Sequence, residues 1–553
     1  MSGEYKDAAE NMKERLNAVS PSFCLAKWNM VSLHLTNGKT HSCYHPPTHD
    51  IPLEGLKENP GLLHNTPQKI EERDKMRKGE RPAGCSYCWR IEDAGHTSDR
   101  HYRSSEWWNE PDFQKIVTNK SLDKTITPAY VEVNFNQACN FKCIYCSPHL
   151  STSWHEEAEK FGPYILKDAA HNDVAALSSY GLMPKKISQK ENPYVEAFWK
   201  WWPELYKTLK IFRMTGGEPL MDNNTFKVLD YVCENPNPDL ELSITSNLCP
   251  PKQELFDKFL NQVKRMETIN HKIRCYVPDP KNGTEWTEWQ HYIIGDKNKR
   301  LAHSEMPSIE IENLPALTET GKSQIDGGFS YDFDCVAPVM KHFSLFVSCD
   351  SVGSQAEYIR TGMNFDRLDK NVRTFLRETH CTNITIINTF NILSIPGLYN
   401  FLEWILDLRE EFAYDKQQPV IFEVPGQNPI IKPRSQRIWF DIPILHTPTW
   451  LSIKMADDNM ISMVEHCVEF MEKNIQGDDY STSFRGFKQY EIDKVRRDLD
   501  IMKQGLDPNR LNTDMIRFSQ YVDELDRRRN TSFAQTFPEL LTFYNKCKEM
   551  IVV

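Results

Sequence analysis

The stretch that decides the fold is AYVEVNFNQACNFKCIYCSP (129–148). Its first part, AYVEVNF (129–135), is rich in β-branched and aromatic residues and predicts a β-strand. Cys139, Cys143 and Cys146 follow directly, separated by three and then two residues. The sequence therefore places a tight cluster of thiols at the carboxyl end of a strand. We call residues 139–146 the cysteine loop.

Three thiolates on so short a loop can converge on one cubane iron–sulfur cluster, because soft sulfur ligands suit such clusters. Three thiolates leave one of the four irons open, and an open iron can bind a small molecule. Zinc is the alternative, but it usually takes four protein ligands. His149 is the one further candidate ligand nearby. The spacing therefore favours a [4Fe–4S] cluster over zinc.

Further strand-then-helix units follow along the chain. The predicted strands share apolar or β-branched residues and cover 210–215, 240–247, 343–350, 383–392 and, as a candidate sixth, 419–424. Repeated units of this kind predict an α/β fold with a parallel sheet and helices outside, either barrel-like or doubly wound. Ligands of such sheets bind at the carboxyl ends of the strands.

The cysteine loop resembles the CxxxCxΦC signature of the radical S-adenosylmethionine (SAM) superfamily, with Tyr145 at the aromatic position. RMTGGEPLM (213–221) resembles the family's GGEP motif, which binds the amino group of SAM. The two glycines let backbone approach a ligand, and a carboxylate suits an ammonium. The resemblance implies a partial (β/α)6 TIM-like barrel and reductive cleavage of SAM to a 5′-deoxyadenosyl radical, which abstracts hydrogen from a substrate.

Two more strand ends resemble family elements. ITSN (244–247) is similar to the polar strand end near the ribose, and FVSCDS (346–351) to the motif that meets the methionine carboxylate. Arg360 is a second candidate for that carboxylate, and the aromatic residue of the cysteine loop is expected beside the adenine. The resemblance thus implies these SAM-binding residues: Tyr145, Gly216, Gly217, Glu218, Pro219, Thr245, Ser246, Asn247, Ser348 and Arg360.

A second cysteine group precedes the barrel. NMVSLHLT (29–36) and the turn at Asn37-Gly38 predict a hairpin that brings Cys24 and Cys43 together, and a CxxC motif supplies Cys85 and Cys88. Four thiolates suit a closed iron–sulfur cluster or structural zinc. The group resembles the twitch domain, a shortened SPASM domain with an auxiliary [4Fe–4S] cluster, and is similar to phage-encoded proteins. In better-known members this domain follows the barrel.

These patterns predict three regions: an N-terminal twitch-like domain (1–110), a barrel (125–450) with insertions at about 150–205 and 268–335, and a helical C-terminal region (451–553). The second insertion is polar and expected to be loop-like. The Trp-rich segment 198–205 is expected to pack as a helix face. The basic run Arg527-Arg528-Arg529 is expected to be solvated.

The charge balance narrows the range of partners. The chain has 553 residues, with 66 Lys and Arg against 77 Asp and Glu, a net charge of −11. This acidic balance disfavours broad binding to nucleic acid or to an anionic membrane. The sequence contains neither a secretory signal nor a run of about 20 apolar residues that could span a membrane. We expect a soluble, cytoplasmic protein, in the host cytoplasm if it is phage-encoded.

The sequence leaves the reaction open. The resemblance implies a radical SAM enzyme that takes electrons from a donor such as flavodoxin or ferredoxin and acts on a peptide or small molecule, with net oxidation through the auxiliary cluster. The alternatives are a radical SAM enzyme that modifies a nucleotide or nucleic acid, and a non-catalytic iron–sulfur electron-transfer protein. An electron carrier needs no SAM-binding strand ends, so residues 216–219 and Ser348 distinguish the last alternative. No catalytic side chain is assigned.

Overall fold

The computed structural model describes most of the chain, and the statements below concern the described residues. They are 3–185, 191–267, 269–278, 290–293, 318–325, 328–337, 340–379, 382–414, 420–422, 430–432, 436–479 and 481–550. The chain divides into two compact units, which are described separately. The first comprises residues 1–138, 174–222 and 240–244, and the second comprises 139–173, 223–239 and 245–553.

The first unit contains the N-terminal cysteines and the first strands of the predicted barrel. Its helices are α1 (Gly3–Val19), α2 (Ala26–Asn29), α3 (Pro67–Arg77), α4 (Ser86–Asp93), α5 (Asp99–Ser105), α6 (Phe113–Thr118), α8 (Val174–Ser179) and α9 (Pro193–Thr208). Its strands are β1 (Met30–His34), β2 (Lys39–His41), β3 (His49–Asp50), β4 (Tyr130–Asn134), β8 (Ile211–Thr215) and the middle of β9 (Asn237–Ser246).

These strands form one sheet in the order β9-β8-β4-β1-β2-β3. β4 pairs in parallel with β8, and β8 with β9, as the strand-then-helix pattern predicts. The hairpin at Asn37-Gly38 is confirmed, because β1 and β2 pair antiparallel across it. β1 also pairs in parallel with β4. The N-terminal cysteine segment therefore shares a sheet with the strand that precedes the cysteine loop.

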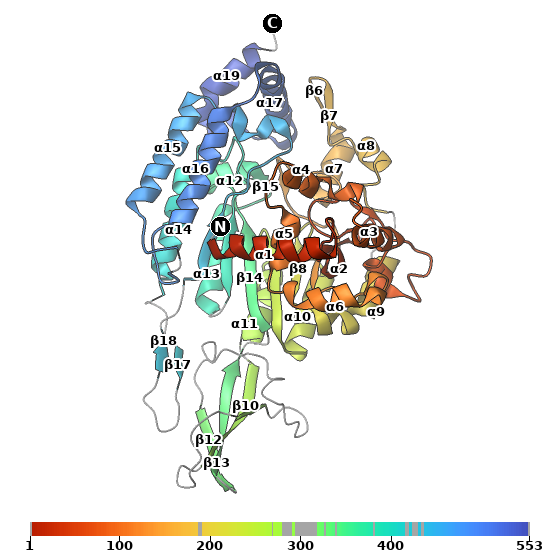
Figure 1. Ribbon diagram of the computed structural model, residues 1–553. Helices are drawn as coiled ribbons and strands as arrows, with labels where there is room; N and C mark the ends of the chain where they lie inside the picture. The colour runs from red at the N-terminus through yellow and green to blue at the C-terminus, as the bar shows by residue number, and fades with distance from the viewer. Residues whose placement is uncertain are drawn as a thin grey trace. The chain divides into compact units, whose positions relative to one another are not determined.

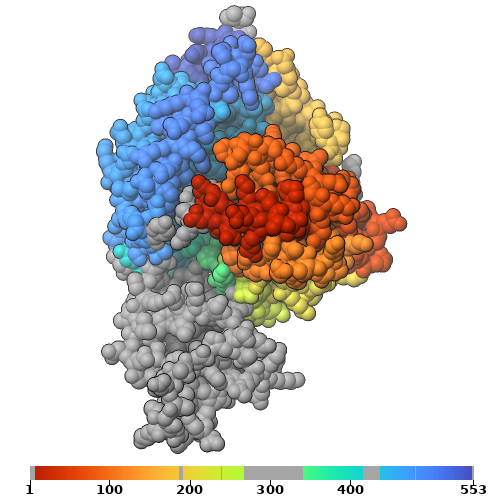
Figure 2. Space-filling model, in the orientation of Figure 1, coloured from red at the N-terminus to blue at the C-terminus, as the bar shows by residue number. Residues whose placement is uncertain are grey.

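The two faces of this sheet differ in polarity. Val131 and Val133 of β4, with Phe212 and Met214 of β8, are almost fully buried, whereas Glu132 lies half-buried on the other face. The Trp-rich segment forms α9, and its aromatic residues Phe198, Trp201 and Trp202 are buried, which confirms the predicted packing. Figure 2 shows α1, in red, on the surface of this unit, where it packs against α5.

The second unit contains the remaining elements. Its helices are α7 (Thr152–Phe161), α10 (Asn223–Glu234), α11 (Gln253–Glu267), α12 (Gly353–Ile359), α13 (Phe365–Glu378), α14 (Leu398–Glu411), α15 (Asp458–Lys473), α16 (Gln489–Gln504), α17 (Pro508–Arg529), α18 (Phe533–Thr536) and α19 (Leu541–Glu549). Its strands are β5 (Lys142–Cys143), β6 (Tyr164–Leu166), β7 (Ala169–His171), β10 (Ile269–Pro278), β11 (Gln290–Ile293), β12 (Thr318–Ile325), β13 (Gly328–Ala337), β14 (Met340–Ser348), β15 (Arg360–Thr361), β16 (Asn383–Ile387), β17 (Val420–Phe422), β18 (Ile430–Lys432) and β19 (Ile438–Asp441).

Two expectations for this unit are wrong. The strand at 419–424 does not join β14 and β16; β17 pairs with β18 as a separate hairpin, and β19 is the strand that pairs in parallel with β16. The second insertion is not simply loop-like, since β10, β11, β12 and β13 form a four-stranded antiparallel sheet (Figure 1). The first expectation rested on a local apolar pattern and the second on polar composition, whereas strand pairing depends on partners distant in sequence.

The C-terminal region is helical, as predicted. α15 packs on α16, and α17 on α19, at the blue end of the chain in Figure 1. The basic run at the end of α17 is not solvated as expected: Arg527 is exposed, but the side chains of Arg528 and Arg529 are buried. Among the helices that the structure describes, none is both long and apolar enough to cross a membrane.

Candidate functional site

The cysteine loop is anchored within the second unit by a short strand pair. β5 pairs antiparallel with β15, with Cys143 opposite Arg360. The amide of Ile144 donates to the carbonyl of Ile359 at 2.9 Å, which extends this pairing. A side chain on Gly362, just after β15, would place its Cβ 2.7 Å from the carbonyl oxygen of Asn140. The loop and the segment after α12 therefore fit closely, backbone against backbone.

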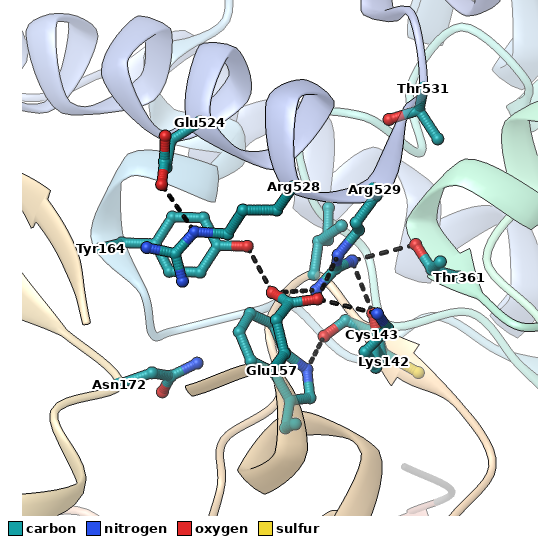
Figure 3. Close-up of polar contacts among 12 residues, drawn as sticks. Lys142, Cys143, Glu157, Tyr164, Asn172, Thr361, Glu524, Arg528, Arg529 and Thr531 are labelled. Atoms are coloured by element: carbon teal, nitrogen blue, oxygen red, sulfur yellow. Dashed lines mark hydrogen bonds and ion pairs between the residues drawn. The ribbon is translucent and has the colours of Figure 1, made fainter. Parts of the chain in front are cut away.

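Side chains from distant parts of the chain hold the carbonyl groups of this loop (Figure 3). The donors and acceptors are Arg529 Nη1 to Lys142 (2.8 Å), Trp154 Nε1 to Cys143 (2.8 Å), Tyr521 Oη to Ile144 (2.5 Å) and Asn172 Nδ2 to Cys146 (3.1 Å). Cys139, Cys143 and Cys146 are half-buried and form no disulfide bond. The backbone is thus held in place while the thiols stay available as ligands.

A buried ion pair lies beside the central thiol. Arg360 binds Asp350 through two atoms, Nε at 2.8 Å and Nη2 at 3.0 Å, and its Nη1 lies 3.5 Å from Cys143 Sγ. Tyr145 donates its hydroxyl to the same carboxylate at 2.7 Å. Sequence reasoning singled out Ser348 in this motif and missed Asp350, although a charged residue directly after a buried strand was a usable signal. Ser348 ends β14 and is half-buried.

Charge and burial act in opposite directions on the loop thiols. Burial raises the pKa of the Cys143 thiol, and the guanidinium of Arg360 acts against that rise. Burial, together with the neighbouring Cys143, raises the pKa of Cys146 to about 12. Thiolates at this place therefore need cationic partners, which a metal centre would supply in addition to the arginine.

We expect Asp350→Ala to destabilise the protein by about 3–5 kcal/mol, because it leaves the guanidinium of Arg360 buried without its counter-ion. Both side chains are almost fully buried, at 0% and 7% exposure. The shift of the urea unfolding midpoint measures the effect. Asp74→Ala, which breaks an exposed pair with Lys78, is the matched control and should cost less than about 1 kcal/mol. Equal midpoints for the two variants would contradict a stabilising role for the buried pair.

The polar strand end at 245–247 is hydrogen-bonded to the cysteine loop. Asn247 donates from Nδ2 to Asn140 Oδ1 at 3.0 Å, and Asn140 donates to the carbonyl of Cys249 at 2.8 Å. Ser246 accepts a hydrogen bond from the amide of Leu248 and shapes the turn. Thr245 is half-buried. Asn247 therefore braces the segment between the first two loop cysteines.

The GGEP turn lies in the first unit, directly after β8. Gly216 has φ +128°, and a Cβ there would lie 2.6 Å from Asn134 Oδ1. A Cβ on Gly217 would lie 2.3 Å from the carbonyl oxygen of Ala138, so both positions require glycine. Glu218 is buried and accepts a hydrogen bond from the amide of Leu220 at 3.0 Å, at the start of a short helix that begins at Pro219.

This turn is hydrogen-bonded through the backbone to the segment of the first unit that ends at Ala138. The amide of Glu218 donates to the carbonyl of Ala138 at 2.6 Å, and Ala138 immediately precedes the first loop cysteine. Within the described chain, two buried acceptors near the turn receive no hydrogen bond: Asn134 Oδ1 and Gln137 Oε1. A buried acceptor without a donor is costly, so these two oxygens suit a ligand that donates hydrogen bonds.

The four N-terminal cysteines come together in the first unit. Cys24, Cys43, Cys85 and Cys88 line one cavity, and none forms a disulfide bond. β2 leads into Cys43, α2 begins just after Cys24, and the CxxC pair lies at the start of α4. The hairpin thus brings the two single cysteines to the CxxC motif, as the spacing predicted.

Positive side chains near this cavity act against the effect of burial on the thiols. Lys27 and Arg100 line it with the cysteines, and Lys27 Nζ pairs with Glu72 at 2.5 Å. Burial and the neighbouring Cys24 raise the pKa of Cys43 to about 12. Over the residues described, no three His, Cys, Asp or Glu side chains are drawn close enough to hold one metal ion.

Comparisons with known proteins give limited similarity. No protein-family model matches the chain. Over 137 residues, 25% of this chain, it is 25% identical to a GTP 3′,8-cyclase of Campylobacter lari. The matched stretch covers 33% of the cyclase, so the chain spans about a third of that relative's length.

Solved structures of SuiB from Streptococcus suis are similar at 10% identity. The structure bound to S-adenosylmethionine has a TM-score of 0.28 and covers 76% of this chain and 73% of SuiB. The structure bound to the precursor peptide SuiA has a TM-score of 0.25 and covers 69% and 60%. Both scores lie well below 0.5, so neither structure supports an inference about this chain.

Proposed function

We propose that this chain is a radical SAM enzyme whose [4Fe–4S] cluster is held by Cys139, Cys143 and Cys146. The observation that carries the proposal is the cysteine loop, with its backbone carbonyls hydrogen-bonded by buried side chains and its three thiols unused by disulfides. Three sulfur donors on a fixed loop match a cluster with one open iron. The fold proposed with it is the partial (β/α)6 barrel.

The hydrogen-bond acceptors beside the GGEP turn fit the amino group of SAM. An ammonium donates hydrogen bonds, and Asn134 Oδ1 and Gln137 Oε1 are buried acceptors that lack a donor among the described residues. The absence of a Cβ at Gly216 and Gly217 allows this close packing of the turn on the segment before the loop. We assign the amino group of SAM to this turn, and its remaining contacts to Tyr145, Thr245, Ser246, Asn247, Ser348 and Arg360 by their resemblance to the family.

The protein's own contribution is to bind, orient and exclude water. When bound, SAM and the cluster supply reductive cleavage of the sulfonium and hydrogen abstraction from an unreactive carbon. Arg360 keeps a positive charge 3.5 Å from the central thiol, and Asp350 holds that guanidinium in place. The side chains of Trp154, Tyr521 and Arg529 around the loop are buried, which limits the access of water and protects reactive species.

The four N-terminal cysteines are proposed to hold an auxiliary [4Fe–4S] cluster in a twitch-like domain. Four thiols around one cavity suit a closed cluster, and structural zinc is the alternative. Four ligands leave no iron open, so this cluster would relay electrons, giving net oxidation, or serve as a structural element. Lys27 and Arg100 also line the cavity, and they pair there with Glu72 and Glu92.

Anaerobic reconstitution with iron and sulfide, followed by dithionite and SAM, tests the proposed function. We expect 5′-deoxyadenosine to form and the electron paramagnetic resonance (EPR) signal of the reduced cluster to change when SAM binds. If the reconstituted protein contains no cluster, or if its EPR signal does not change on adding SAM, the proposed function is rejected. An electron-transfer or structural role would then remain for the chain.

We expect Asn134→Ala to weaken SAM binding by about tenfold or more, because a hydrogen bond to a charged group contributes roughly 1.5–3 kcal/mol. Equilibrium dialysis of the reconstituted protein measures the dissociation constant independently of activity. Asn509→Ala, at an exposed position of α17, is the matched control. Wild-type affinity in the Asn134 variant would remove this residue from the binding site.

The substrate class is a further part of the proposal. We favour a peptide or small molecule, with a flavodoxin or ferredoxin as the electron donor. A nucleotide is the second candidate, which the similarity to a GTP 3′,8-cyclase favours. Deoxyadenosine release in the presence of GTP, compared with peptide mixtures, distinguishes the two classes.

A further inference from the structure

The C-terminal end of α17 contacts the cysteine loop directly. Arg529, the last residue of this helix, has a fully buried side chain. Its Nη1 donates to the carbonyl of Lys142 at 2.8 Å and to Thr361 Oγ1 at 2.9 Å (Figure 3). It therefore grips both strands of the β5–β15 pair that carries Cys143.

Arg529 belongs to a buried cluster of charges. Its Nε lies 3.1 Å from Glu157, whose side chain is 2% exposed. The same carboxylate binds Lys142 Nζ at 2.9 Å and accepts the hydroxyl of Tyr164 at 2.6 Å. Two cations share one carboxylate, which leaves a net positive charge next to the loop. Burying such groups costs several kcal/mol per ion unless the geometry is good, so this arrangement needs a reason.

A second residue of α17 acts on the other side of the same cysteine. Tyr521, also buried, donates its hydroxyl to the carbonyl of Ile144 at 2.5 Å. Arg529 additionally lies over the ring of Trp154, at 4.7 Å from the guanidinium carbon to the ring centroid, and Trp154 Nε1 donates to the carbonyl of Cys143. One helix thus reaches the carbonyls of residues 142 and 144 directly and the intervening carbonyl through an indole.

The neighbouring arginines do not share this role. Arg527 is exposed and pairs with Glu524 on its own helix. Arg528 donates to the carbonyls of Gly162 and Pro163, after α7. Within the basic run, the contacts described to the cysteine loop come from Arg529 alone.

We propose that α17 is a positioning element for the cluster loop, and that the charge of Arg529 makes the bound cluster easier to reduce. This inference rests on the function proposed above. Reduction adds an electron, and a positive charge in a low-dielectric setting stabilises the reduced form. The hydrogen bonds from Arg529 and Tyr521 fix the backbone on either side of Cys143, and so restrict where its thiol can lie.

A potentiometric titration of the full-length, anaerobically reconstituted protein tests the charge effect. The EPR signal that changes on adding SAM reports the cluster with the open iron. For Arg529→Met we expect the ratio of reduced to oxidised cluster, at a fixed potential, to fall at least about tenfold. This corresponds to a midpoint potential lower by about 59 mV for a one-electron couple. Arg527→Met makes the same charge change on the same helix and should stay within about twofold of wild type.

Two conservative variants separate charge from geometry. Arg529→Lys keeps the charge and should keep the reduced ratio within about threefold of wild type, since lysine replaces the fork by a point charge. Tyr521→Phe removes the hydrogen bond to the carbonyl of Ile144 and should weaken SAM binding about fivefold at unchanged potential. If Arg529→Met assembles no SAM-responsive cluster, the Tyr521→Phe variant decides. Weaker SAM binding by that variant supports the proposal, and SAM binding as tight as that of wild type overturns it.

The outcomes distinguish this inference from the function on which it rests. Wild-type protein without a SAM-responsive signal would overturn the proposed function itself. If the wild-type signal responds to SAM but Arg529→Met changes the ratio of reduced to oxidised cluster by less than about twofold, only the role of Arg529 is overturned.

Discussion

Cys139→Ala is expected to abolish formation of 5′-deoxyadenosine from SAM. The loop supplies three thiols, one for each of three irons, and the fourth iron binds SAM. With only two cysteines left, we expect the protein to lose the cluster. Iron content should also fall by about four atoms per chain. Deoxyadenosine is measured chromatographically after incubation with dithionite and SAM.

Cys467→Ala is the matched control for this experiment. Cys467 is a buried cysteine of α15 that belongs to neither ligand group, so its loss removes a thiol without removing a ligand. Wild-type amounts of deoxyadenosine from the Cys139 variant would reject the cysteine loop as the site of SAM cleavage.

Cys85→Ala is expected to reduce iron and acid-labile sulfide from about eight to about four atoms each per chain. SAM cleavage should continue in part, because the open-iron cluster is untouched, while productive turnover stops for lack of the relay. Metal analysis and deoxyadenosine formation measure both effects. Ser86→Ala, at the adjacent exposed position, is the control. If wild-type protein contains about four irons and one zinc per chain, the N-terminal cysteines hold a structural zinc ion and not an auxiliary cluster.

Much of the fold was predictable because strands leave a local pattern. The predicted strands at 129–135, 210–215 and 240–247 correspond to β4, β8 and β9. The prediction that the strand at 419–424 joins the main sheet was wrong. Hydrophobic alternation indicates a strand but does not indicate which strand it pairs with. β1 shows the same limit: its hairpin with β2 was readable from Asn37-Gly38, but its parallel pairing with β4 was not.

The candidate site divides in a similar way. Convergence of the four N-terminal thiols on one cavity was predicted from their spacing and the hairpin. Asp350 and Arg529 were missed, because a charged residue in sequence resembles a solvated one. Both lie buried against partners far away in the chain, and the basic run 527–529 was therefore misjudged.

The sequence by itself identified the candidate ligands of the cysteine loop, because covalent geometry keeps thiols on one short loop near one another. Only the tertiary structure decided which side chains surround that loop. Arg529 and Lys142 are 387 residues apart, and a buried charge is stable only where the folded chain brings its counter-ion and hydrogen-bond acceptors to it.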